Sequence, residues 1–90
     1  MAWDVEFKQS AFRQLEKLDR AIQRRILAFL KDRVTAGADP RLHGKALQGD
    51  RQGLWRYRVG DYRIICEIQD HRLVVLVLSL GHRKEIYRGR

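Results

Sequence analysis

Three arginines in the second half of the sequence stand in a pattern that could handle phosphate. Arg56 and Arg58 alternate with apolar residues, and Arg63 follows in a second alternating run. The planar guanidinium fork binds two phosphate oxygens at once and keeps its charge at physiological pH. A cluster of such groups also stabilises the negative charge that develops during phosphoryl transfer. The pattern therefore favours binding of a phosphodiester, or chemistry on it.

The Gly-Asp pair at residues 60–61 predicts a two-residue hairpin turn, and the turn fixes which residues face each other. Arg58 is then paired with Arg63, and Arg56 with Ile65. Because apolar residues fill the alternate positions and must meet the core, we expect the three arginines on the open face of the sheet. Facing like charges cost on the order of 0.2 to 1 kcal/mol, which a bound anion would remove. The alternative is an ordinary solvated basic face.

Four further residues are candidates on type and position. Arg83 and Tyr87 lie four residues apart, so a helical turn would project both from one side, although a tyrosine near a chain end often serves packing alone. His82 has an intrinsic pKa suited to proton transfer. Lys45 lies in a basic loop, where it either contacts nucleic acid or is simply exposed. Two other histidines lack neighbours at metal-ligand spacing, His43 and His71.

The N-terminal half predicts a strand followed by two helices. Apolar residues at positions 3, 5 and 7 alternate with acidic ones, which indicates a short strand. Ser10 is predicted to cap the first helix and Asp19 the second, which runs to about Ala36. Gly37 and the following Asp-Pro pair end it. Residues 37–53 are predicted to be a loop, with a short extended piece around Ala46 and Leu47.

The C-terminal half predicts three strands in a meander. Alternation over residues 55–59 and 62–68 forms a hairpin, and the apolar run 73–78 indicates a strand covered on both faces. Gly81 is predicted to end that strand, and residues 83–87 to form one or two helical turns. The expected fold is one α+β domain over residues 1–90, with a helical hairpin on one face of a mostly antiparallel sheet.

Charge and composition limit the classes of function. The net charge is +8, and it divides into +2 for residues 1–40 and +6 for residues 41–90; 14 of the 19 basic residues are arginine. This balance favours a polyanionic partner, either nucleic acid or an acidic protein. The lone Cys66 cannot form an internal disulfide and is predicted to be a small buried apolar residue. No signal or membrane-spanning pattern is present, so we expect no membrane partner.

Blocks of the sequence resemble RelE-type toxins of the RelE/ParE superfamily. The matching segments are 47–49 (LQG), 54–65 (LWRYRVGDYRII) and 81–87 (GHRKEIY). The N-terminal half agrees more loosely, through Phe7 and the two-helix pattern that ends in Gly37. The resemblance covers nearly the whole chain and implies the RelE/ParE-like fold.

The resemblance implies a toxin of a type II toxin-antitoxin system that inhibits translation. Such a toxin enters the A site of the 70S ribosome and cleaves mRNA through attack of a ribose 2′-hydroxyl on the adjacent phosphate. We therefore expect a cytoplasmic, metal-independent endoribonuclease without a cofactor. The implied protein partner is a RelB-type antitoxin that forms a hetero-oligomer with the toxin.

The resemblance also implies roles for individual residues. Arg63 and Arg83 would stabilise the developing charge, with help from Arg58, and Arg56 would orient the phosphate together with Arg58. Tyr87 would transfer a proton; its phenol, of pKa about 10, is a poor base unless neighbouring arginines lower that value. Some family members carry lysine at positions 56 and 58, and arginine cannot act as a base, so the identity of the base stays open. Two further residues are expected to bind substrate on their type and position alone, Lys45 and His82; the resemblance gives His82 no settled catalytic role.

Two other functions compete with RNA cleavage. A ParE-like protein would inhibit DNA gyrase by binding, but that branch usually lacks the phosphate-handling set, and the presence of Arg63, Arg83 and Tyr87 argues against it. A non-catalytic basic module would use its charge only to hold an acidic partner. Loss of toxicity on substitution of Arg83 or Tyr87 would separate this module from an enzyme.

Overall fold

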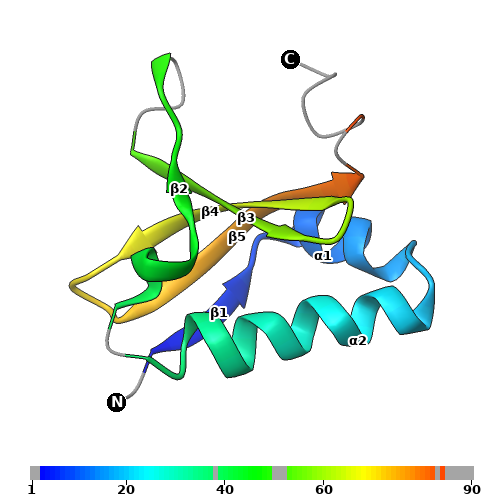
Figure 1. Cartoon of the computed structure of the whole chain (residues 1–90), viewed down its shortest axis with the longest axis horizontal. Helices are drawn as coiled ribbons and strands as arrows, with labels where there is room; N and C mark the ends of the chain where they lie inside the picture. The colour runs from blue at the N-terminus through cyan, green and yellow to red at the C-terminus, as the bar shows by residue number, and fades with distance from the viewer. Residues whose placement is uncertain (1–2, 38, 50–52, 83, 85–90) are drawn as a thin grey trace.

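A five-stranded sheet carries the two α-helices of the described residues on one side (Figure 1). The computed structural model describes residues 3–37, 39–49, 53–82 and 84. The strand order is β1-β5-β4-β3-β2, in which β1 runs parallel to β5 and every other pair is antiparallel. The elements are β1 (Asp4–Phe7), α1 (Gln9–Glu16), α2 (Arg20–Phe29), β2 (Lys45–Ala46), β3 (Leu54–Val59), β4 (Tyr62–Gln69) and β5 (Val74–His82). The predicted α+β class with a mostly antiparallel sheet is confirmed.

The start of α1 differs from the prediction. Its N-cap is Lys8, so the predicted cap Ser10 lies within the first turn of the helix. The reason is that β1 reaches this point: the Lys8 amide donates to the Val77 carbonyl at 2.9 Å, and the Lys8 carbonyl accepts from the Phe12 amide. Asp19 does occupy the N-cap position of α2, but its side chain makes no capping hydrogen bond.

The second helix ends with one wider turn. After Phe29 the chain continues as the π-helical turn η1 (Leu30–Val34), in which the Thr35 amide donates to the Leu30 carbonyl at 2.9 Å. The Thr35 hydroxyl donates to the same carbonyl at 3.2 Å. The helical segment therefore stops close to the predicted end at Ala36.

The predicted loop 37–53 contains a short helix that the sequence patterns did not indicate. Residues Pro40–His43 form the 3₁₀ helix η2, in which the Asp39 carboxylate accepts from the Arg41 amide at 3.0 Å and proline occupies the first turn. The extended piece that follows, β2, begins one residue earlier than predicted. The loop prediction is thus correct only in part.

The hairpin of β3 and β4 has the predicted register. Arg58 is paired with Arg63, and Arg56 with Ile65. Gly60 has a φ of +60°, which fits the first turn position of a type II′ hairpin, where glycine is favoured. Period-2 alternation and turn chemistry are local properties, which is why the sequence was sufficient here.

Strand β5 is shifted toward the C-terminus relative to the prediction. Leu73 lies in the preceding turn with a φ of +55°, and the strand begins at Val74. Gly81 does not end it, because pairing with β4 continues through Arg63↔Gly81 and Tyr62↔His82. The predicted helical turns at 83–87 lie outside the described residues.

The core lies between the helices and the inner face of the sheet. Ile26 and Leu30 of the helical layer pack with Tyr57, Ile64 and Val77, each less than 2 % exposed. Cys66 belongs to this core, as predicted, and its burial raises the pKa of its thiol. No helix within the described ranges is long and apolar enough to cross a membrane.

Candidate nucleic-acid interface

Four basic side chains lie on the face of the sheet opposite to the helices. Residues paired directly across antiparallel strands point to the same face. Lys45 is paired with Arg56, and Arg58 with Arg63, so β2, β3 and β4 contribute to one surface. We call these four residues the basic stripe. Tyr57 alternates with the arginines of β3 and is fully buried in the core, which confirms that the arginines face away from it.

The four members of the stripe differ in burial. Lys45 and Arg58 are exposed, and Arg56 is half-buried. Arg63 is only 9 % exposed, so the prediction of an open position is wrong for this residue. Its partner on β5 is Gly81, which contributes no side chain, and Ile65, 2 % exposed, lies two residues along the same face. Arg63 therefore sits in the floor of the surface, in partly apolar surroundings.

The guanidinium of Arg63 has donors that no acceptor among the described residues uses. Its Nε and Nη1 atoms are buried and have no hydrogen-bond partner among the described residues. Within the same ranges, neither Arg58 nor Arg63 forms an ion pair with a carboxylate. A buried charge without an acceptor is destabilising by several kcal/mol in general. The position beside Arg58 is thus suited to an anion with several oxygen acceptors.

The structure does not bring His82 to the basic stripe. Its partner on β4 is Tyr62, whose side chain packs against the core. The two rings meet edge to face, with centroids 5.7 Å apart, and the Nδ1 atom of His82 accepts from the Lys84 amide at 3.2 Å. The sheet separates this histidine from the arginines. The other two C-terminal candidates, Arg83 and Tyr87, lie outside the described residues.

A groove of about 350 Å³ adjoins the stripe at the β3 edge of the sheet. We call it the edge groove. It shares Lys45, Arg56 and Arg58 with the stripe and adds residues from α2, η1 and the η2 segment: Phe29, Arg33, Leu42, His43 and Gly44. Sequence reasoning missed the added residues, because they come from separate elements. The one local signal was the four-residue spacing of Phe29 and Arg33 on a helix.

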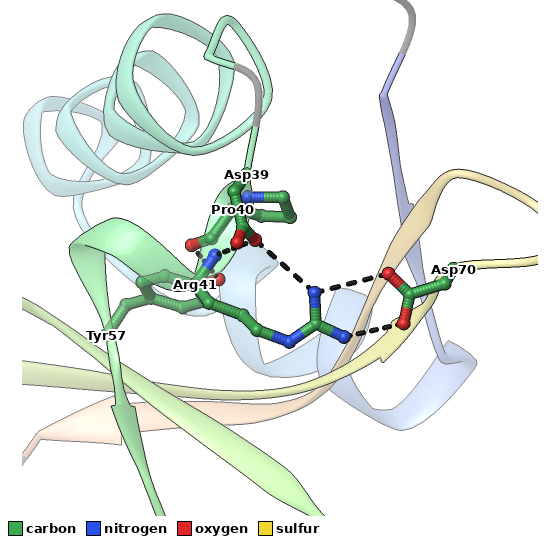
Figure 2. A network of polar contacts seen from close by, with 5 residues as sticks. All are labelled: Asp39, Pro40, Arg41, Tyr57 and Asp70. Atoms are coloured by element: carbon green, nitrogen blue, oxygen red, sulfur yellow. Dashed lines mark hydrogen bonds and ion pairs between the residues drawn. The ribbon is translucent and has the colours of Figure 1, made fainter.

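An ion-pair network holds η2 in place beside the groove (Figure 2). The Arg41 guanidinium donates to both carboxylate oxygens of Asp70, at 2.6 and 3.2 Å, and to Asp39 at 3.3 Å. The Tyr57 hydroxyl donates to the Pro40 carbonyl at 2.8 Å. We call this set the η2 clamp. It ties a loop helix to β3 and to the turn between β4 and β5.

Titration behaviour agrees with the geometry of the clamp. The hydrogen bond from Arg41 holds the pKa of Asp70 below its ordinary value, and the same bond raises the pKa of Arg41. Burial raises the pKa of Tyr57, so its hydroxyl stays protonated and remains a donor. Both shifts therefore favour the protonation states in which Asp70 accepts from Arg41 and Tyr57 donates to the Pro40 carbonyl.

Comparison with known proteins identifies relatives over nearly the full length. The model of a family described as "ParE toxin of type II toxin-antitoxin system, parDE" matches residues 5–87. Toxin RelG of Mycobacterium tuberculosis is 32% identical over 88 residues, which cover 98% of this chain and 99% of that protein. Toxin RelE of the same organism is 29% identical, over 96% of this chain and 87% of that protein.

Solved structures share the fold. The toxin-antitoxin complex RelBE2 from Mycobacterium tuberculosis contains a chain that is 30% identical, with a TM-score of 0.79 and coverage of 92% of this chain and 93% of that one. The isolated RelE toxin of Escherichia coli is 22% identical, with a TM-score of 0.73 and coverage of 96% and 92%. The second likeness concerns the fold alone.

Proposed function

The chain belongs to the RelE/ParE superfamily of type II toxin-antitoxin toxins, and on that premise we propose that it is an endoribonuclease that cuts mRNA in the ribosomal A site. The observation that carries the proposal is Arg63. This arginine is buried opposite Arg58, on the sheet face away from the helices, with two donor atoms that no described residue satisfies. Solubility alone does not explain this arrangement, because a buried arginine without an acceptor destabilises the fold.

The proposed reaction is an in-line displacement at phosphorus. The ribose 2′-oxygen attacks the adjacent phosphate, so the O2′–P bond forms and the P–O5′ bond breaks. One group takes the proton of the 2′-hydroxyl and another gives a proton to the leaving 5′-oxygen. The products are a 2′,3′-cyclic phosphate and a free 5′-hydroxyl, and no metal or cofactor takes part. Charge grows on the non-bridging oxygens, where preorganised cationic donors are most effective.

The basic stripe divides this task by position. Arg63 and Arg58 face each other and would hold the non-bridging oxygens between them. Arg56 and Lys45 form the next pair along the same face and would bind a neighbouring phosphate. No member of the stripe is a good base at neutral pH. We therefore keep the roles that the resemblance assigns to two C-terminal residues, Arg83 for charge stabilisation and Tyr87 for proton transfer.

We further propose that a RelB-type antitoxin binds this chain in the cytoplasm and forms a hetero-oligomer with it. The support is that the structure of its relative from Mycobacterium tuberculosis is described as a toxin-antitoxin complex. The remaining proposed partners are the 70S ribosome and the mRNA in its A site.

The direct test is primer extension on a reporter mRNA in a translating extract, with and without active ribosomes. Arg63→Ala is compared with the wild type and with Arg13→Ala, which removes an exposed charge from α1. The proposal predicts cuts in register with codons that require ribosomes, persist in Arg13→Ala and vanish in Arg63→Ala. Cuts that persist in Arg63→Ala would remove the basis of the proposal.

A second function is kept because the matching family model carries the ParE name. A ParE-like protein would inhibit DNA gyrase by binding. A gyrase supercoiling assay separates the two functions. Inhibition of supercoiling beside an intact message would favour the gyrase reading and would reduce the basic stripe to a docking surface.

A further inference from the structure

The edge groove continues the basic stripe around the side of the sheet. Arg56 and Arg58 contribute to both surfaces. A single-stranded nucleic acid bound to the stripe therefore reaches the groove without crossing another surface. In the described part of the chain, β2 pairs with β3 at Trp55 and Arg56, and the Leu47 amide continues the pairing by donating to the Leu54 carbonyl. The remaining edge of β3 therefore borders the groove, whose opposite walls come from α2, η1 and η2.

The charge of the groove fits a polyanion. Its lining holds four basic residues, Arg33, Lys45, Arg56 and Arg58, and none of the described lining residues is acidic. The nearby carboxylates of Asp39 and Asp70 are both engaged by Arg41. The groove thus presents a positive lining, and both carboxylates of the neighbouring clamp are held in ion pairs with Arg41.

The same groove offers an apolar surface of the kind on which a base can lie. Leu42 is 75% exposed, the largest exposed fraction among the large apolar residues of the described ranges. Phe29 is half-buried and contacts Tyr57 edge to face, with centroids 6.1 Å apart, which fixes the orientation of its ring. Basic groups beside apolar and aromatic side chains are typical of sites for unpaired nucleotides.

The wall of the groove is built before any ligand arrives. Gly44 lies so close to β3 that a Cβ atom there would be 2.9 Å from the Tyr57 ring and 3.0 Å from the Arg56 carbonyl oxygen. The η2 clamp fixes the residues before it. Binding therefore does not require this segment to become ordered, which reduces the entropic cost of association.

We propose that the edge groove binds an unpaired RNA nucleotide that flanks the phosphate held by the stripe. The proposal rests on the proposed function for the identity of the polymer. In it, Arg33 and Lys45 contact the backbone, and the base lies against Leu42 and Phe29. The groove would thereby set the direction in which the RNA strand leaves the stripe.

The test measures affinity separately from cleavage. The full-length protein is titrated into a fluorescently labelled, single-stranded 2′-O-methyl RNA, which lacks the attacking hydroxyl and cannot be cut. Binding is followed by anisotropy at several salt concentrations, for the wild type, Arg33→Ala, Leu42→Ala and the control Arg24→Ala. Arg24 is exposed on α2 and does not line the groove.

Each substitution has a distinct expected result. Arg33→Ala weakens binding about five-fold. It also makes the negative slope of log affinity against log salt less steep by about 0.7, the change expected when one phosphate contact on a single strand is lost. Leu42→Ala weakens binding about five-fold with an unchanged slope, because it removes apolar contact with the base and no charge. Arg24→Ala changes neither quantity. Unchanged affinity and slope in both groove variants would overturn the proposal.

Two further outcomes distinguish this proposal from the proposed catalytic site and from a binding surface for the antitoxin. If Arg63→Ala leaves the message cut while the groove variants still lose RNA affinity, the proposed catalytic site fails and the groove stands. If the groove variants keep their RNA affinity but bind the antitoxin more weakly, the groove is a surface for an acidic protein segment, and the RNA proposal is overturned.

Discussion

Arg41 and Arg63 are the same side chain in two opposite situations. Arg41 is partly exposed and donates to two carboxylates, Asp39 and Asp70, so its charge is compensated within the protein. Arg63 is more deeply buried, faces another arginine and has two donor atoms without a partner in the part of the chain that the structure describes. Arg41 stabilises the fold through carboxylates that the protein itself supplies, whereas we propose that Arg63 binds an anion supplied by a ligand. The comparison predicts opposite effects when the two regions are altered.

The largest expected effect is on the side of Arg63. Arg63→Met should reduce RNA cleavage by about 10²- to 10³-fold, because removal of one preorganised donor to the charge that develops in the transition state lowers kcat by about that factor. The same substitution should raise the free energy of unfolding by about 1 kcal/mol, since an apolar side chain replaces an uncompensated buried charge. Cleavage assays and urea denaturation measure the two effects. A variant that is inactive and clearly less stable would mean that Arg63 is a structural residue.

Gly44→Ala should destabilise the protein at the η2 clamp. The added Cβ atom meets the Tyr57 ring and the Arg56 carbonyl oxygen, and the backbone atom cannot move cheaply. We expect a loss of about 1 to 3 kcal/mol of unfolding free energy, the usual cost of overpacking. Urea denaturation again provides the measurement. Gly37→Ala is the matched control, because nothing lies within 4 Å of the position of its Cβ atom. Equal stability of the two variants would contradict the packing argument.

Tyr57→Phe isolates one bond of the clamp. It removes the buried hydroxyl that donates to the Pro40 carbonyl and leaves the ring in the core. The expected loss of stability is about 1 kcal/mol, since a buried acceptor then lacks its partner. Thermal unfolding measures the change, and RNA cleavage at saturating substrate should stay within about two-fold of the wild type. A large loss of cleavage with little loss of stability would place Tyr57 in the reaction.

The smallest effect concerns pH. The hydrogen bond from Arg41 holds the pKa of Asp70 below its ordinary value, so the unfolded chain binds the proton more readily than the folded one. Stability from this carboxylate is therefore present above the unfolded pKa and is lost as pH falls through the lowered pKa of the folded state. Asp70→Asn should flatten the decline of the urea midpoint below about pH 4. An identical pH profile for the wild type and the variant would show that the pair contributes nothing.

The sequence predicted features that depend on neighbours along the chain. The register of β3 and β4 follows from alternation and from Gly60, which has the positive φ that the turn requires. The placement of Arg56, Arg58 and Arg63 on one face follows from that register. The helical hairpin was predicted by its apolar stripe for the same reason.

Features that depend on distant segments were missed. The Lys8 amide donates to the Val77 carbonyl of β5, so the helix begins before the predicted cap at Ser10. Pairing with β4 carries β5 past Gly81, a residue that in isolation indicates an end. The burial of Arg63 depends on surroundings from several elements, and no spacing along the chain reports it. These differences all come from tertiary contacts that override a local preference.

The central claim is that Arg63 binds a phosphate of the RNA, whereas the charge of Arg41 is already compensated by Asp39 and Asp70. The most direct measurement is the ¹H–¹⁵N spectrum of the arginine Nε groups, recorded while a 2′-O-methyl RNA is added, with the two signals assigned by Arg63→Lys and Arg41→Lys. The account predicts that the Arg63 signal shifts as the RNA binds and the Arg41 signal does not. If the RNA binds while the Arg63 signal stays in place, the unused donors of Arg63 are not the phosphate site, and the central claim is wrong.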